Sequence, residues 1–173
     1  DVEQATCFSG EDQTERGYLL GDKEAPVYCG LNAGGTKERF LPAVAYGTSG
    51  DTMRPVHVGK DSAVFVRGGS VHAIDEGCLI LEIQQNSNTT YRIYDWGRMG
   101  NDGKPRELHI EQAVNVINWN DHENPLVEPT VLVDTPEFQA LEVLRCEYFC
   151  LEKLTFSIPL EVPMDEKTFH ALF

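Results

Sequence analysis

This sequence of 173 residues has no long apolar runs. Stretches such as residues 78–81 are far shorter than the roughly 20 apolar residues that a membrane-spanning helix needs. No charged segment followed by an apolar one opens the chain, so no targeting leader is expected. These absences predict that the protein has no membrane partner and a cytoplasmic location.

Basic residues are scarce. The chain has 14 Lys and Arg against 28 Asp and Glu, which gives a formal net charge of −14. Such a field repels polyanions at long range, so nucleic acid is not an expected partner. A phosphorylated ligand would need a local group of basic side chains against this background, which draws attention to individual arginines.

The five cysteines are an odd number and contain no Cys-x-x-Cys pair. This usage excludes a dense disulfide scaffold and fits a reducing cytoplasm. Cys146 and Cys150 are expected on one face of a strand, as buried structural thiols or as a redox or metal pair. The others are Cys7, Cys29 and Cys78.

Common catalytic motifs are also missing, including the dinucleotide and phosphate loops, His-Glu-x-x-His and the nucleophile elbow. What is present is a series of short runs rich in Val, Ile, Phe, Tyr and Thr between residues 53 and 95, separated by Gly- and Asn-containing turns. This pattern predicts an antiparallel jelly-roll sandwich or small barrel. Two strands are expected within 18–31, and a last set at about 130–133, 141–151, 153–160 and 168–173.

Two helices are expected beside these strands. The first has Thr36 as its cap and Gly47 as its left-handed end, with Phe40, Leu41, Val44 and Ala45 on one face. Pro42 predicts that this helix is kinked or begins later than the cap suggests. The second helix places on one face Ile110, Ala113, Val114 and Ile117.

Three residues are candidates for chemistry. His72 enters a strand after Gly68-Gly69, with Val71 and Ala73 on the opposite face, so it either points into a barrel or is an ordinary core or surface histidine. Arg92 either faces an anionic ligand, with Thr90 and Tyr94 on its side, or pairs with a carboxylate. Glu15 precedes a strand and by itself has the pattern of an exposed acid.

Residues 69–98 contain Gly69-Ser-Val-His72-Ala-Ile and Thr89-Thr-Tyr-Arg92-Ile-Tyr-Asp95, and residues 103–110 read Gly-Lys-Pro-Arg-Glu-Leu-His-Ile. These segments resemble short bacterial-type type I phosphomannose isomerases. The resemblance implies a mainly β fold, a cupin jelly-roll β-barrel with one or two short helices, partly truncated. It also implies a catalytic core over 1–118 that lacks its N-terminal strands, a connector over 119–129, and the start of a C-terminal cupin-like portion over 130–173.

The same resemblance implies a zinc-dependent enzyme that interconverts mannose 6-phosphate and fructose 6-phosphate. In that family a cupin barrel holds Zn²⁺ through a Gln, two His and a Glu. By their positions in the family motifs, His72 and Glu15 are implied metal ligands and Arg92 an implied catalytic residue. Arg98 would either assist with phosphate or form a surface ion pair. The resemblance does not assign the catalytic base.

The sequence departs from the family pattern at several positions. The upstream Val-Gln-Val-His-Pro ligand motif has no counterpart in residues 1–6, so two metal ligands are missing and the chain is expected to be an internal fragment. The family residues are also replaced at Gln13, Arg16, Gly17 and Asn88. The alternative hypothesis is therefore a catalytically inactive cupin remnant that serves as a sugar-binding or interaction module.

Overall fold

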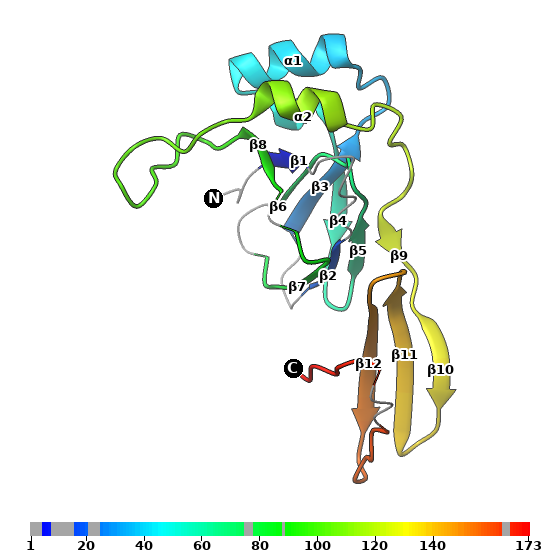
Figure 1. The fold of residues 1–173 in the computed structure, drawn as a ribbon. Helices are drawn as coiled ribbons and strands as arrows, with labels where there is room; N and C mark the ends of the chain where they lie inside the picture. Colours follow the sequence, from blue (N-terminus) through cyan, green and yellow to red (C-terminus); the bar gives the residue numbers. More distant parts are fainter. Residues whose placement is uncertain (1–4, 8–15, 21–24, 75–77, 88, 164–166) are drawn as a thin grey trace.

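The computed structural model describes residues 5–7, 16–20, 25–74, 78–87, 89–163 and 167–173. Antiparallel β-structure dominates it (Figure 1). Five of the described strands form one sheet in the order β4-β3-β6-β1-β8. Their bounds are β1 (Ala5–Cys7), β3 (Ala25–Leu31), β4 (Met53–Val58), β6 (His72–Ile74) and β8 (Tyr91–Tyr94).

A second sheet faces the first and has the order β7-β2-β5-β9. Its strands are β2 (Arg16–Leu20), β5 (Ala63–Val66), β7 (Ile80–Gln84) and β9 (Leu126–Val127). Between the sheets lies a cluster of buried side chains from both: Val27, Cys29, Val56, Val58, Val64, Val66 and Ile74. The two sheets therefore form a sandwich, and the prediction of a mainly β fold of the jelly-roll kind is confirmed.

The two helices, α1 (Lys37–Tyr46) and α2 (Ile110–Val116), lie together against the first sheet (Figure 1). The α1 helix starts directly after Thr36 and ends at Gly47, whose φ of 73° is left-handed. The amides of Gly47 and Thr48 bond the carbonyls of Val44 and Ala43, at 3.1 and 2.8 Å. The positions of both predicted ends are confirmed, although the Thr36 side chain forms no capping hydrogen bond. Of the two alternatives for Pro42, a kink or a later start, the later start is wrong.

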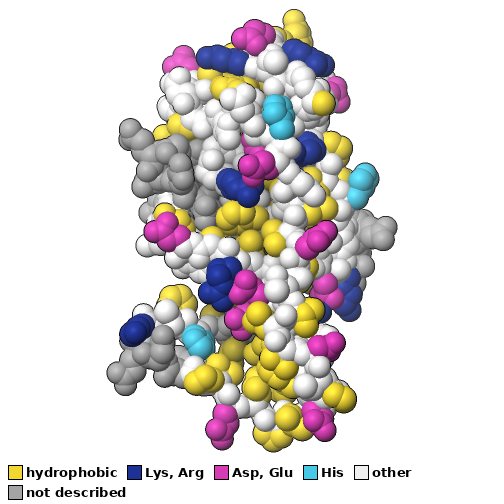
Figure 2. Space-filling model, turned by 90° about the vertical axis from the view of Figure 1, so that its right-hand side faces the viewer, with side chains coloured by type: hydrophobic (Ala, Val, Ile, Leu, Met, Phe, Trp, Pro, Cys, Tyr) yellow, Lys and Arg dark blue, Asp and Glu magenta, His cyan; other side chains and the backbone are white. Residues whose placement is uncertain are grey.

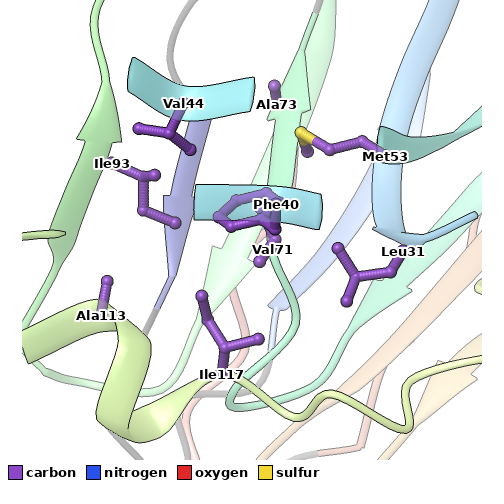
Figure 3. Close-up of a cluster of buried hydrophobic side chains, with 9 residues drawn as sticks. All are labelled: Leu31, Phe40, Val44, Met53, Val71, Ala73, Ile93, Ala113 and Ile117. Carbon is purple, nitrogen blue, oxygen red and sulfur yellow. The ribbon is translucent and has the colours of Figure 1, made fainter. Parts of the chain in front are cut away.

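Phe40 is the centre of the cluster beneath the helices (Figure 3). Its side chain is 0% exposed, and it lies among residues of both helices and of the first sheet. The predicted helix faces are confirmed at the residues that the cluster contains, whereas Ala45 is exposed. The buried members are Leu31, Phe40, Val44, Met53, Val71, Ala73, Ile93, Ala113 and Ile117.

Gly30 gives β3 a local irregularity where two polar side chains come close to the backbone. Its φ is +73°, and its amide bonds the carbonyl of Val71 at 2.8 Å. A Cβ at this position would lie 2.5 Å from Arg54 Nη2 and 3.0 Å from Asp121 Oδ2. Arg54 and Asp121 form an ion pair at 3.9 Å that joins β4 to the loop after α2. Only glycine leaves room for this pair.

Replacing Gly30 with alanine is expected to lower the free energy of unfolding by about 1–3 kcal/mol, because a strained φ is combined with displacement of the ion pair. Urea denaturation followed by circular dichroism measures this. Gly103→Ala is the matched control, since Gly103 has the same φ of +73° and nothing within 4 Å of the added Cβ. An equal loss in both variants would contradict the role of the ion pair.

The last part of the chain forms a three-stranded sheet in the order β10-β11-β12. Its strands are β10 (Thr130–Asp134), β11 (Phe138–Arg145) and β12 (Cys150–Phe156). Val143, Leu144 and Leu151 form a buried cluster with Ala63 of β5. Hydrophobic side chains are nevertheless visible over the lower part of the molecule in Figure 2, and the exposed ones of this sheet include Val131, Leu132, Val133 and Phe156.

Two sequence predictions fail in this region. Residues 167–173 are not a strand, and the side chains of Phe169, Leu172 and Phe173 are 81–87% exposed. An apolar run that packs against no other apolar surface buries too little area for strand formation to be favourable. Cys146 and Cys150 do not share a strand either, because Cys146 lies in the turn that precedes β12 and its amide bonds the Phe149 carbonyl at 3.0 Å.

Among the described helices, none is long and apolar enough to cross a membrane.

Candidate functional site

His72 is the first residue of β6, directly after a tight turn. That turn needs Gly69, which has a φ of +83° and lies so close to α2 that a Cβ would be 2.9 Å from the Val116 carbonyl. His72 is 4% exposed, and its Nδ1 lies 3.2 Å from the Ser70 carbonyl. A carbonyl only accepts, so this hydrogen bond requires the hydrogen on Nδ1, and a neutral ring with that tautomer would have its lone pair on Nε2. This arrangement orients a histidine as a metal ligand.

Strand register places His72 and Arg92 in one row of the first sheet. Thr6 of β1 is opposite His72 on one side and opposite Arg92 on the other. Directly opposed residues share a face, and two strand spacings correspond to about 10 Å. Val71 and Ala73 belong to the cluster beneath the helices, whereas Ile74 belongs to the cluster between the sheets. Alternation therefore turns His72 towards the interior of the sandwich, which fits both the barrel-facing and the core-histidine alternatives that the sequence leaves open.

Cys29 is the neighbour of His72 on the other side of the row, since β3 and β6 pair these two residues. Its thiol is 2% exposed. Burial, and to a lesser extent the negative charge of Asp121, raises the pKa of Cys29 to about 12. The thiol is thus protonated at neutral pH, and its reactivity as a nucleophile is suppressed.

Arg92 is contacted by residues 107–109, where the chain returns to β8 after the turn at residues 98–106. Its amide donates to Nδ1 of His109 at 3.2 Å, and its carbonyl accepts from the His109 amide at 2.7 Å. The guanidinium Nη1 donates to the Glu107 carbonyl at 3.1 Å, and Nε lies 3.8 Å from Asp95 Oδ1. The prediction that Tyr94 lies on the same side as Arg92 fails, because Tyr94 packs against the cluster beneath the helices together with Tyr91.

Asp95 is the charged residue that the sequence prediction overlooked. Its side chain is 5% exposed. Arg106 Nε donates to Oδ2 at 2.6 Å, and Arg106 Nη2 donates to Oδ1, which makes a two-pronged ion pair. The available signal was the spacing Arg92-x-x-Asp95 at the end of a strand, next to the arginine of the Lys104-Pro-Arg-Glu-Leu-His109 segment. Asp95 and His109 therefore lie next to Arg92, and Arg106 is bonded to Asp95.

The predicted ligand Glu15 lies outside the described residues. In the described part of the chain, three side chains could jointly hold a metal ion, and these are Glu142, Cys150 and Glu152 on the C-terminal sheet. This group does not include His72. Arg145 lies 2.6 Å from Glu142, and burial raises the pKa of the Cys150 thiol. An arginine among the acids and a protonated thiol both disfavour a cation there.

A cavity of about 250 Å³ lies near this row on its helix side. Ala73 and Tyr94 line it, together with Tyr28, Asp51 and Trp96 among others. Because Ala73 faces away from the sandwich interior, this cavity is not the space towards which His72 points.

No family model matches the chain. The mannose-6-phosphate isomerase ManA of Bacillus subtilis is 36% identical over 149 residues, which cover 84% of this chain and 45% of that protein. The probable mannose-6-phosphate isomerase GmuF of the same organism is 40% identical over 146 residues, which cover 84% and 45%. Among solved structures, the mannose 6-phosphate isomerase from Bacillus subtilis superposes with a TM-score of 0.78 at 27% identity, covering 91% of this chain and 53% of that one.

The fold is therefore that of the phosphomannose isomerases, a cupin fold. Within that fold class, the chain is a homologue of mannose-6-phosphate isomerases over most of its own length. It spans about half the length of the curated relatives that it matches.

Proposed function

We propose that the protein is a zinc-dependent isomerase that interconverts mannose 6-phosphate and fructose 6-phosphate. The observation that carries this proposal is that His72 and Arg92 share one row of the first sheet. It is supported by the 36–40% identity of the chain, over 146–149 residues, to proteins named as mannose-6-phosphate isomerases. The backbones of these two residues are separated by two strand spacings, about 10 Å, and a small sugar phosphate is of similar size. We also propose the division into a core over 1–118, a connector over 119–129 and a C-terminal portion over 130–173.

The proposed chemistry moves a proton between C1 and C2 of the sugar phosphate. His72 would hold Zn²⁺ through Nε2, with Glu15 as a second ligand. When bound, the metal supplies a Lewis acid that polarises the sugar oxygens. Arg92 stabilises the negative charge that develops on oxygen as the proton leaves carbon. The Glu107 carbonyl and Asp95 hold its guanidinium in place, so little reorientation is needed during the reaction.

The charge and cysteine pattern supports a cytoplasmic location and a small phosphorylated sugar as the partner. The five cysteines form no dense disulfide pattern, a usage that fits a reducing compartment. The loop after β8 carries Arg98, Lys104 and Arg106 against Asp95, Asp102 and Glu107, so it is neutral overall, whereas the whole chain has a net charge of −14. A neutral segment repels a phosphate less than the rest of the chain does.

A second candidate function is an inactive cupin module that binds sugar without converting it. It is favoured by the ligand set, because His72 and Glu15 are two protein ligands, whereas zinc sites usually have at least three. The substitutions at Gln13, Arg16, Gly17 and Asn88 favour it as well. The two functions differ in whether zinc is retained and whether fructose 6-phosphate is consumed.

Zinc content of the purified 173-residue chain is the first test. About one zinc per chain by elemental analysis is expected in the wild type, and its loss is expected in His72→Ala, because the oriented Nε2 is removed. His57→Ala is the control, since His57 is exposed on β4 and should leave the zinc content unchanged. In parallel, the zinc-loaded complete gene product is assayed for conversion of fructose 6-phosphate to mannose 6-phosphate.

Zinc that persists in His72→Ala would remove His72 from the ligand set. A zinc-loaded complete gene product that leaves fructose 6-phosphate unchanged would contradict the isomerase function and support the inactive module.

A further inference from the structure

We propose that Asp95 is a positioning residue that sets the orientation of the Arg92 guanidinium through Arg106. This inference deepens the proposed function and rests on it, because it assigns a role towards the arginine that the reaction uses. It starts from a buried carboxylate that lies between two guanidinium groups in a strongly acidic protein.

The first step concerns the loop that follows β8. Between Arg98 and Arg106 the chain turns back on itself, with Gly100 and Lys104 bonded across the turn at 2.7 Å and Met99 bridged to Pro105. The returning segment ends at Arg106, whose side chain donates two hydrogen bonds to Asp95. The ion pair therefore connects the end of this segment to the residue that follows β8.

The second step concerns what this segment presents to Arg92. Glu107 directly follows Arg106, and its carbonyl accepts from Arg92 Nη1 at 3.1 Å. Two residues later, His109 pairs with both backbone groups of Arg92. The contacts of Arg92 with residues 107–109 are thus formed by the segment that Arg106 anchors. If Arg106 is released, the carbonyl that orients the guanidinium moves with it.

The third step is electrostatic. Oδ1 of Asp95 accepts from Arg106 Nη2 and also lies 3.8 Å from Arg92 Nε, so one carboxylate oxygen lies close to both cations. Its side chain is 5% exposed, where solvent screens poorly. Without the negative charge, the two guanidinium groups would repel each other across this gap. Asp95 thus keeps the Arg92 guanidinium close to Arg106 and to the Glu107 carbonyl.

The test replaces Asp95 with asparagine, which keeps the shape and removes the charge. We expect kcat of the complete gene product to fall about 10- to 100-fold with a smaller change in KM, because a misplaced catalytic group slows the chemical step more than binding. The matched control is Asp102→Asn in the same loop, where the exposed carboxylate accepts from the Lys104 amide at 3.1 Å. This control should keep the wild-type kcat.

Two readouts separate positioning from a general structural effect. Combined with Arg92→Lys, which cannot form the same contacts, Asp95→Asn should cause little further loss, whereas a residue that only supports the fold would lower kcat equally in both backgrounds. The Arg92 Nε–H signal of the ¹⁵N-labelled chain, assigned by its loss in Arg92→Lys, should shift or broaden in Asp95→Asn and remain unchanged in Asp102→Asn.

An unchanged Arg92 signal in Asp95→Asn would overturn the positioning role, whatever the activity. Equal losses of kcat in both backgrounds would do the same. A wild-type protein without isomerase activity would instead contradict the proposed function, and the Arg92 signal would still decide whether Asp95 sets the guanidinium.

Discussion

Arg92→Lys is expected to lower kcat for the isomerisation of fructose 6-phosphate by about 100- to 1,000-fold in the zinc-loaded complete gene product, the range for losing one preorganised donor to a developing oxyanion. Lysine keeps the positive charge. It lacks the planar fork by which Arg92 bonds the Glu107 carbonyl through Nη1 while its Nε lies near Asp95. The ammonium is therefore free to reorient, and its charge is no longer held in one position.

Steady-state kinetics measures this effect. Arg67→Lys is the control, because Arg67 forms an ion pair with Glu123 at 2.9 Å and both side chains are largely exposed. Its replacement should leave kcat unchanged, since exposed ion pairs contribute little. A variant of Arg92 with wild-type kcat would show that the resemblance assigns this residue the wrong role.

The orientation of His72 could be predicted from the sequence because it depends on local rules. A Gly-rich turn fixes where the strand begins, and the period of two then places His72 opposite Val71 and Ala73. The structure agrees, since Val71 and Ala73 belong to the cluster beneath the helices. The row that joins His72 to Arg92 could not be derived in this way, because it depends on β1 lying between two strands that are distant in the sequence.

The surroundings of Arg92 show a similar limit. A charged residue in a short polar loop gives no sign of its partner, because an ion pair depends on where two backbones meet. Asp95 and Arg106 are 11 residues apart and meet only after the loop has folded back. The sequence prediction for Arg92 offered a carboxylate partner and an anionic ligand as alternatives. In the structure Asp95 lies near Arg92 Nε, but the main partner of Asp95 is Arg106.

The failed strand at the end of the chain has a different cause. Apolar residues at 169–173 match a strand by composition, but a strand also needs a neighbour and a surface to cover. The side chain of Phe169 is 87% exposed. Local pattern cannot report this, because the pattern is the same whether or not the packing partner is present.

Phe40→Ala is expected to lower the free energy of unfolding by about 3–5 kcal/mol, because it opens a cavity in a fully buried cluster. Phe40 is 0% exposed and packs edge-on against Trp119, with ring centroids 5.8 Å apart. Its neighbours Ala73 and Ile93 directly follow His72 and Arg92 in β6 and β8. The cavity would therefore lie directly behind the row that carries the proposed site.

Urea denaturation followed by circular dichroism measures the loss, with Phe169→Ala as the control. Phe169 is 87% exposed, so its removal should change stability by less than about 0.5 kcal/mol. The Arg92 Nε–H signal gives a second readout, and it should broaden in Phe40→Ala because β8 loses support from behind. Equal stability of the two variants would mean that the helices do not share one cooperative core with the sheet, and the row of His72 and Arg92 would then depend on the contacts between the sheets alone.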